Sequence, residues 1–310
     1  MILILILSFS FPDLKDDLSN FWNSLNKIGG FSGFEILEVD LDAPMNSMAG
    51  NYWDKGVHAL LFNPAEIIQS ESSSSFKSEA TFTHRILGCS MNAEFLGFTK
   101  PIWCGTVGLS FLGFFSGDME LRRNIPGNPV GNYSAEDLIG GLSYARNLGN
   151  NSLGGTIRFL NERIFTGSYS TYSFDLGISH NFSIPKIEAL RMDISFLHLG
   201  PKYTNYKFRL PLTWHLGLKG NFGSFRGGFS LNKPLNTKTQ WTIGGEYKIR
   251  WFAIRVGSKR VGAGKNSENF LEKYYVGFGL HKNRFYFDYS YSPNDNGYEG
   301  SHLFTASLEI

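Results

Sequence analysis

The sequence predicts an all-β protein, an antiparallel transmembrane β-barrel of about 14 strands with a short helical N-terminal plug. Three observations support this fold class. Apolar and polar residues alternate through most of the chain after about residue 78. The alternating segments reach the roughly 9–11 residues that a tilted strand needs to cross a bilayer, whereas a typical soluble strand has about 5–6. Finally, the connections between these segments alternate between short and long.

The chain begins with MILILILSFSF, which is typical of the apolar core of a secretory signal. We expect residues 1–10 to be a signal peptide, because Ser8 and Ser10 are small enough to permit cleavage before Phe11. The basic region that usually precedes such a core is missing, which points to a start further upstream. A buried first strand is the alternative. Apolar spacing at residues 14–25 then predicts a short amphipathic helix.

Residues 11–77 form the expected N-terminal segment and plug, and within them residues 44–77 do not follow the alternation. This stretch contains a plausible helix at about 51–62, ended by Asn63-Pro64. A helical segment directly before a barrel is naturally placed inside it, and a periplasmic tail is the alternative. The candidate plug residues are Met48, Gly50, Trp53, Asn63, Pro64 and Ala65.

Residues 78–310 form the expected barrel, and the stretch KFRLPLTWHLGLKG at 207–220 shows its pattern. One parity holds Phe208, Leu210, Leu212, Trp214, Leu216 and Leu218, and the other holds Lys207, Arg209, Thr213, His215 and Lys219. Successive side chains of a strand point to opposite faces, so each strand has one apolar and one polar face. Strands are expected near 78–88, 89–98, 103–119, 135–148, 151–166, 171–184, 188–199, 207–220, 222–232, 239–250, 252–262, 271–281, 284–292 and 300–310.

The apolar face of such strands has different surroundings in a soluble protein and in a membrane protein. In a soluble β-sandwich the apolar face would pack against a second sheet. In a closed barrel it meets lipid, and closure pairs every backbone group. Strand length, the even strand count, the loop asymmetry and the export signal favour a bacterial outer-membrane barrel that crosses the lipid many times, with its C-terminal strand ending on the periplasmic side. Residues expected to contribute to the interfacial aromatic belts are Trp214, Trp241, Trp251, Tyr247, Tyr289 and Tyr291.

Charged residues on the polar parity are expected to face the lumen. They either guide a solute or hold the plug, or they only neutralise each other across neighbouring strands. Their mixed signs argue against a strongly ion-selective pore. The lumen candidates are Arg158, Glu162, Asp175, Arg191, Asp193, Arg209, His215 and Asp288.

Composition and motifs predict neither an enzyme nor a nucleic-acid partner. The 29 basic and 27 acidic residues are interspersed rather than clustered. The 7 histidines are scattered without HExxH or metal-ligand spacing, and GSKRVGAGKN at 257–266 fails the spacing of a phosphate-binding loop. We therefore expect no catalytic residue, metal or cofactor. Cys89 and Cys104 are expected to be free thiols, with a single bridge as the alternative.

Several stretches together resemble the PorV/PorQ family of outer-membrane proteins. These are FEILEVDLDAPMNSMAG, ALLFNPAEI, DLIGGLSYARNLGNNSLGGTIRFLNERI, YSFDLGISH and the closing FYFDYSYSPNDNGYEGSHLFTASLEI, within residues 34–310. The chain departs from the family pattern at Pro44, where Arg is usual, and at Glu66, where Gly is usual. The resemblance implies a FadL-type barrel of fourteen strands with an N-terminal hatch.

Two functions follow as hypotheses. The resemblance to the PorV/PorQ family implies a role in secretion or surface attachment, with exported proteins or secretion components as partners. The alternative is a FadL-like gated passage of hydrophobic or small solutes across the outer membrane.

Overall fold

The computed structural model describes residues 32–68, 77–88, 90–122, 127–183, 189–203, 208–235, 237–261, 271–293 and 300–310. The predicted signal peptide at residues 1–10, the predicted helix at 14–25 and Cys89 lie outside these residues. In the described part of the chain, no helix is long and apolar enough to cross a membrane.

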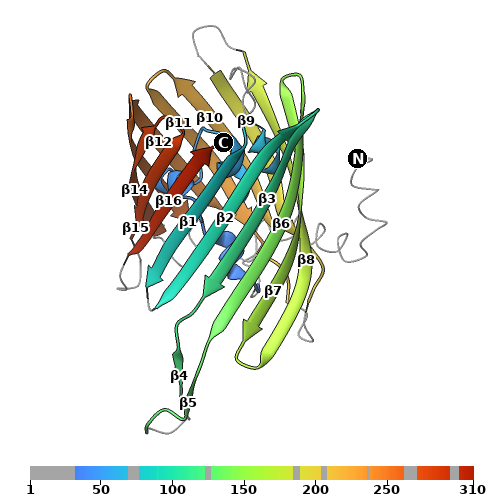
Figure 1. The fold of residues 1–310 in the computed structure, drawn as a ribbon, viewed down its shortest axis with the longest axis vertical. Coiled ribbons are helices and arrows are strands. Elements are labelled where there is room, and N and C mark those ends of the chain that lie inside the picture. The colour runs from blue at the N-terminus through green and yellow to red at the C-terminus, as the bar shows by residue number, and fades with distance from the viewer. Residues whose placement is uncertain are drawn as a thin grey trace.

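Fourteen strands close into one antiparallel barrel, which confirms the predicted fold class (Figure 1). Each strand of the ring pairs with the one before it, and β16 closes the ring on β1. The ring contains β1 (Glu79–Gly88), β2 (Met91–Ile102), β3 (Gly105–Phe115), β6 (Ala135–Leu148), β7 (Asn151–Ile164), β8 (Gly167–Phe182), β9 (Ala189–Leu199), β10 (Thr213–Phe222), β11 (Phe225–Pro234), β12 (Gln240–Ile249), β13 (Phe252–Val261), β14 (Leu271–Lys282), β15 (Phe285–Ser292) and β16 (Ser301–Glu309). Two further strands, β4 (Met119–Leu121) and β5 (Gly131–Tyr133), form a hairpin that extends beyond the wall between β3 and β6 (Figure 1).

The two ends of the barrel differ in their connections. At the end where β16 terminates, two residues join β2 to β3, β6 to β7, β10 to β11, β12 to β13 and β14 to β15. At the other end the connections after β3, β9, β13 and β15 are long, although β1–β2 and β7–β8 are also joined by two residues. Tight turns and the end of the last strand identify the periplasmic end of an outer-membrane barrel.

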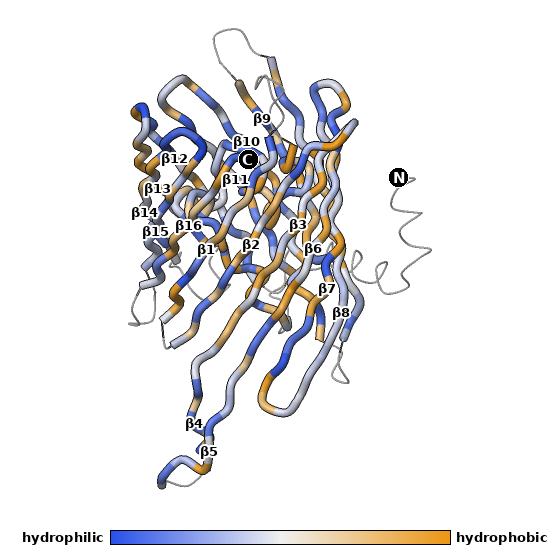
Figure 2. Tube along the Cα trace, viewed as in Figure 1, coloured by the Kyte–Doolittle hydropathy of each residue, from blue (hydrophilic) through white to orange (hydrophobic). Residues whose placement is uncertain are grey.

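Apolar side chains point outward and polar ones inward around the ring. On β13, Ile254 and Val256 are 49% and 56% exposed, whereas Arg255 between them is fully buried. Figure 2 shows the resulting alternation of hydropathy along the strands. Large apolar side chains exposed on this scale are unfavourable in water, and a spanning sheet is tolerated in hydrocarbon only when it is closed. The outer face is therefore the lipid-facing face.

The predicted strand at 207–220 is wrong in its first half, because β10 begins at Thr213. Pro211 has no N–H to donate to a ladder, so the regular pairing begins only after it. Leu210 and Leu212 are buried at 3% and 5% exposure instead of facing lipid. Arg209, predicted to face the lumen from this strand, lies before it, where its carbonyl accepts a hydrogen bond from the N–H of Gly33 at 3.1 Å.

The N-terminal segment lies inside the barrel (Figure 1). It contains η1 (Glu35–Glu38), α3 (Ala43–Ser47), η2 (Gly56–Ala59) and η3 (Pro64–Ile67). α3 packs against β13 to β16, η2 against β1 and β2, and η3 chiefly against β6, β7 and β8. Its apolar side chains share a core with the wall that includes Leu41, Leu60, Phe95, Leu112 and Leu160.

The predicted helix at 51–62 is wrong, since only the short η2 forms there. Gly56 has φ +86°, a left-handed conformation that interrupts a helix. The regular helix is α3 instead. Its N-cap Asp42 accepts a hydrogen bond from the N–H of Met45 at 3.0 Å, and Pro44 occupies the first turn.

Candidate functional site

The contact between the N-terminal segment and the barrel wall is the candidate functional site. Glycines of the wall allow the segment's backbone to approach directly. A Cβ atom at Gly154 of β7 would lie 2.3 Å from the carbonyl oxygen of Pro64, and one at Gly177 of β8 would lie 2.0 Å from Oδ1 of Asn63. The same Oδ1 caps η3 by accepting a hydrogen bond from Ala65 N–H at 3.0 Å. The predicted plug triplet Asn63-Pro64-Ala65 therefore packs directly against Gly154 and Gly177.

A second contact of this kind lies beside α3. A Cβ at Gly244 of β12 would lie 2.2 Å from the carbonyl oxygen of Met48, and one at Gly257 of β13 would lie 2.7 Å from the N–H nitrogen of Ala49. Met48 is fully buried, and Gly50 has φ +88°, which turns the chain after α3. Both contacts could have been expected from the sequence, because Gly244 and Gly257 lie on the lumen parity of their strands and leave room for another backbone.

Glu66 of the segment is the centre of one buried ionic network. Its carboxylate contacts Nε of Arg191 at 2.6 Å and Nζ of Lys219 at 2.9 Å. Asp193 extends the network with Lys219 at 3.4 Å and with Nε2 of His215 at 2.8 Å. Arg191, Asp193 and Lys219 lie on β9 and β10, so the carboxylate of the segment completes the charge balance of the wall.

The same arginine also holds the predicted plug residue Trp53. The guanidinium of Arg191 lies 4.4 Å from the ring centroid of Trp53 and donates a hydrogen bond to its carbonyl oxygen. A cation over an aromatic face is attracted by the ring quadrupole. Arg191 of β9 thus contacts the segment at two residues, Glu66 and Trp53.

A second buried network joins Arg158 and Asp175. The two side chains form an ion pair, and Nη2 of Arg158 donates a hydrogen bond to the carbonyl oxygen of Leu60 in the segment at 3.1 Å. Asp175 also accepts a hydrogen bond from the backbone N–H of His198 at 2.8 Å. Both charges are paired and the segment accepts one hydrogen bond from the guanidinium, whereas Nε of Arg158 has no hydrogen-bond partner among the described residues.

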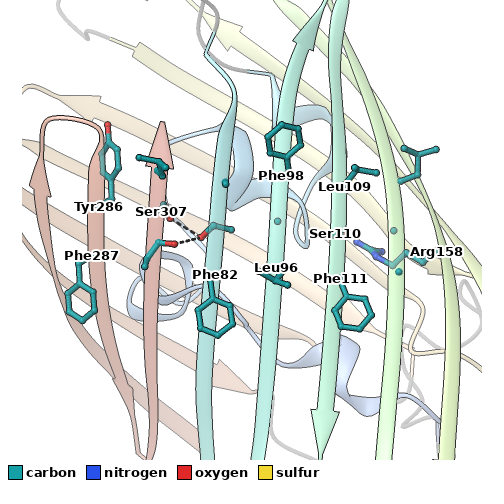
Figure 3. Close-up of a pocket in the computed structure, with 18 of the residues that line it drawn as sticks. Phe82, Leu96, Phe98, Leu109, Ser110, Phe111, Arg158, Tyr286, Phe287 and Ser307 are labelled. Atoms are coloured by element: carbon teal, nitrogen blue, oxygen red, sulfur yellow. Dashed lines mark hydrogen bonds between the residues drawn. The ribbon is translucent and has the colours of Figure 1, made fainter. Parts of the chain in front are cut away.

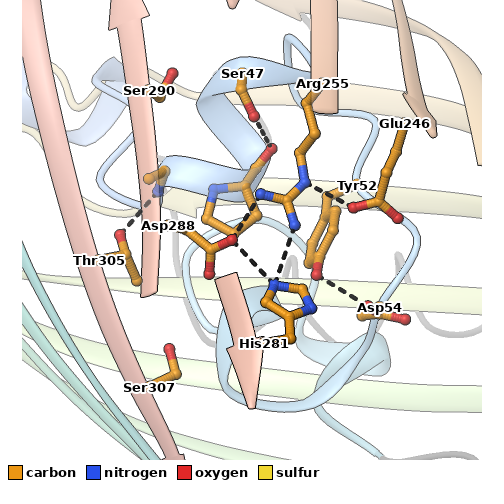
Figure 4. Close-up of polar contacts among 12 residues, drawn as sticks. Ser47, Tyr52, Asp54, Glu246, Arg255, His281, Asp288, Ser290, Thr305 and Ser307 are labelled. Atoms are coloured by element: carbon orange, nitrogen blue, oxygen red, sulfur yellow. Dashed lines mark hydrogen bonds and ion pairs between the residues drawn. The ribbon is translucent and has the colours of Figure 1, made fainter. Parts of the chain in front are cut away.

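A third network surrounds Arg255, as Figure 4 shows. Arg255 contacts Glu246 at 2.7 Å and Asp288 at 2.7 Å, and its guanidinium lies 5.0 Å from the ring centroid of Tyr52. The hydroxyl of Tyr52 donates to Asp54 at 2.9 Å. Arg255 is not among the predicted lumen residues, although its place on the lumen parity of β13 could have identified it.

The predicted lumen residues therefore fall into separate groups. Arg191, Asp193 and His215 lie together, Arg158 pairs with Asp175, and Asp288 belongs to the Arg255 network. Glu162 is half-buried on β7, opposite Asp137 of β6, and belongs to none of these networks. Arg209 lies outside the barrel strands.

Titratable groups within the segment are also paired. Burial alone would lower the pKa of His58, but the Asp42 carboxylate 2.6 Å away raises it to about 9. Burial likewise opposes ionisation of Asp54, yet Arg226 at 2.9 Å lowers the pKa of that carboxyl below its usual value. Opposite charges outweigh desolvation at both positions.

A cavity of about 140 Å³ lies between the segment and the wall, near the extracellular ends of β9 to β12. An engineered apolar cavity of about 150 Å³ is large enough for benzene. The segment contributes Leu37, Leu61 and Phe62 to the lining, and the wall contributes Asn232 and Gln240. The lining also includes charged and titratable side chains, namely Glu38, Asp40, Arg158, His198, His215 and Lys259. The cavity can accept a small solute with an apolar body that also carries polar groups.

A larger hollow lies on the outer face of the barrel. This groove is open and has a volume of about 1330 Å³, and Figure 3 shows Phe82, Leu96 and Phe111 along it. Ala80, Gly140 and Ala306 leave space there. These residues have the outward parity, so lipid chains cover the groove, and we do not assign it to the lumen site.

The described residues contain no group of three or more His, Cys, Asp or Glu side chains that could hold a metal ion. Cys104 is an exposed thiol in the β2–β3 turn.

Comparison with known proteins finds similarity of fold. No family model matches the chain, and no curated protein matches its sequence. Among solved structures it is similar to the Pseudomonas putida toluene transporter TodX, with a TM-score of 0.61 and 11% identity over 87% of this chain and 98% of that one. It is also similar to the CymD monoaromatic hydrocarbon channel (TM-score 0.60, 10% identity, 87% and 97% covered). A Pseudomonas aeruginosa FadL homologue gives a TM-score of 0.54 at 10% identity, covering 86% of this chain and 95% of that one.

These likenesses concern the fold, and they extend over nearly the full length of each neighbour. Together with the closed ring and its apolar outer face, they agree with the predicted location in the bacterial outer membrane. The chain is an outer-membrane β-barrel with the fold of FadL-type channels.

Proposed function

We propose that this protein is a channel for small hydrophobic or amphipathic solutes, and that residues 32–68 are its plug. The observation that carries the proposal is the cavity of about 140 Å³ between the plug and the wall. A ring of 14 strands lies between the roughly 8 strands whose interior side chains fill and the roughly 16–18 that leave an aqueous channel. Side chains of the wall alone do not fill a ring of this size, so passage through the lumen depends on the position of the plug.

The size of the cavity favours a solute with a single ring over a long acyl chain. The neighbours TodX and CymD are named for toluene and for monoaromatic hydrocarbons, which supports the same class. The polar groups of Asn232 and Gln240 suit a solute that carries a hydroxyl or carbonyl group. Secretion or surface attachment of partner proteins has only the sequence resemblance to the PorV/PorQ family in its favour, and passage of solutes is the better supported function.

A reversible lock on the plug tests the proposal. A Cβ at Gly228 of β11 would lie 3.0 Å from the Cβ of Asn51, close to the roughly 3.5–4.5 Å of a disulfide. We would combine Asn51→Cys with Gly228→Cys after replacing the native Cys89 and Cys104 by Ser, and compare each single variant. Uptake of a labelled single-ring solute into cells should fall on oxidation and recover on reduction. Equal uptake by the oxidised and reduced double variant would refute the gating role.

A further inference from the structure

The periplasmic end of the barrel carries exposed positive charges. Arg250 lies in the turn between β12 and β13, Lys282 ends β14, and Arg284 lies in the turn that follows; all three side chains are exposed. β13 and β14 pair in a register that sets Phe252 opposite Leu280, so the same register continued by two residues sets Arg250 opposite Lys282. No ion pair joins these three cations to an acid among the described residues.

Aromatic rings flank the three cations. Trp251 is 61% exposed and Phe285 is 66% exposed. The backbone N–H of His281 donates to the carbonyl oxygen of Trp251 at 2.7 Å, which holds the two turns together. Glu309 lies beside Arg284, with an electrostatic interaction between them, but its carboxylate forms its ion pair with Lys77 at 2.5 Å. Aromatic rings beside cations are typical of the level at which lipid headgroups meet hydrocarbon.

Arg250 also occupies a conformation that its side chain disfavours. Its φ is +52°, whereas the corresponding first positions of the β6–β7, β10–β11 and β14–β15 turns hold Gly149, Gly223 and Asn283. Glycine and asparagine adopt a positive φ readily, and other residues do so at a cost. A strained arginine is therefore present in a turn where asparagine would fit better, which points to a role for its side chain.

The outward face of β13 and β14 shows where this cluster lies in the membrane. Between Arg250 and Arg260 the strand advances about 33 Å, at roughly 3.3 Å per residue. With a tilt of about 40°, this gives a height near 25 Å, which matches the apolar band of outer-membrane barrels. The apolar part of this face is Phe252, Ile254 and Val256 on β13 with Leu280, Phe278 and Val276 on β14.

The two ends of this strip differ in charge. At the extracellular end Arg260 is neutralised by Glu272, at 3.4 Å. Another outward arginine near that end, Arg163, lies 3.4 Å from Glu136. At the periplasmic end the extended register sets Arg250 opposite Lys282, and neither forms an ion pair with a carboxylate of the described residues. Two like charges in register repel unless an anion lies between them.

We propose that Arg250, Lys282 and Arg284, flanked by Trp251 and Phe285, bind the phosphate of an anionic phospholipid in the inner leaflet of the outer membrane. The guanidinium groups and the ammonium group donate to the phosphate oxygens, while the rings contact the glycerol and upper acyl region. The cluster lies on the outside of the barrel, so it is independent of the plug and of the proposed solute.

The test measures lipid retention by the full-length protein. Native mass spectrometry would count the lipids kept after exchange from nanodiscs of phosphatidylcholine with phosphatidylglycerol. Each cation near a membrane surface contributes about a fivefold preference for anionic lipid. The wild type should therefore keep phosphatidylglycerol preferentially, and the Arg250→Asn, Lys282→Gln, Arg284→Gln variant should lose that preference at least about tenfold.

Two comparisons make the outcome decisive. Arg250→Asn relieves the positive φ, so the triple variant is expected to fold, and its thermal midpoint in phosphatidylcholine would verify this. Arg260→Gln removes a cation at the opposite end and should leave retention unchanged. The proposal is overturned if the wild type shows no preference, if the folded triple variant retains phosphatidylglycerol within about twofold of it, or if Arg260→Gln causes an equal loss.

Discussion

Gly154→Ala tests whether the plug is held against the wall by direct backbone contact. The added Cβ would lie 2.3 Å from the carbonyl oxygen of Pro64 and 2.6 Å from the N–H nitrogen of Ala65. Both are backbone atoms at the capped start of η3, so no side-chain rotation relieves the clash. Forcing a methyl group into a packed site costs roughly 1–3 kcal/mol. The same energy favours a displaced plug by about 5- to 150-fold.

Gly155→Ala is the matched control. It lies on the same strand with the outward parity, where the nearest atom to a new Cβ is the carbonyl oxygen of Asp175 at an ordinary 3.5 Å. In planar bilayers Gly154→Ala should raise conductance or the frequency of opening, and Gly155→Ala should behave as the wild type. Thermal unfolding in detergent would verify that both barrels are folded. Identical conductance of the two folded variants would refute the direct contact as the restraint on the plug.

Three further predictions concern the lipid face, the plug charge and pH. Ile254→Arg, at a side chain 49% exposed about midway between Arg250 and Arg260, should lower the free energy of unfolding in liposomes by about 2–4 kcal/mol, and Ile310→Arg at the periplasmic end by about 0–1 kcal/mol. The reverse order would invert the assigned depth. Glu66→Gln leaves two buried cations short of a carboxylate and should weaken plug docking by roughly 3–5 kcal/mol, measured as faster protease cleavage of the plug, so an unchanged rate would contradict the network. Because the pKa of His58 is raised from 6.5 to about 9 by Asp42, its contribution to stability is fully present below pH 6.5 and is lost as pH rises through about 9. Cleavage should therefore increase with pH in the wild type, whereas a His58→Gln variant with the same pH profile would exclude this pair as the cause.

The strands and their faces could be predicted because alternation is a local property of the sequence. Side chains of a strand point alternately to the two faces, so Ile254, Arg255 and Val256 are assigned to their faces from their order alone. Closure then followed from the lipid-facing character of the apolar parity, since an open edge is not tolerated in hydrocarbon. The error at 207–220 arose because alternation continues through Pro211, although proline cannot donate to the ladder.

Only the tertiary structure decided which charges meet and where the plug lies. Glu66 is distant in sequence from Arg191 and Lys219, and no local pattern links them; their contact depends on the register of β9 with β10 and on the path of the plug. The glycines that receive the plug are visible in the sequence, but a glycine becomes a docking point only when another backbone is brought against it, as Pro64 is against Gly154. Periodicity thus determined the wall, whereas the plug and its ion pairs were determined by packing between segments far apart in the chain, because burying a charge requires a partner that only the closed barrel brings within reach.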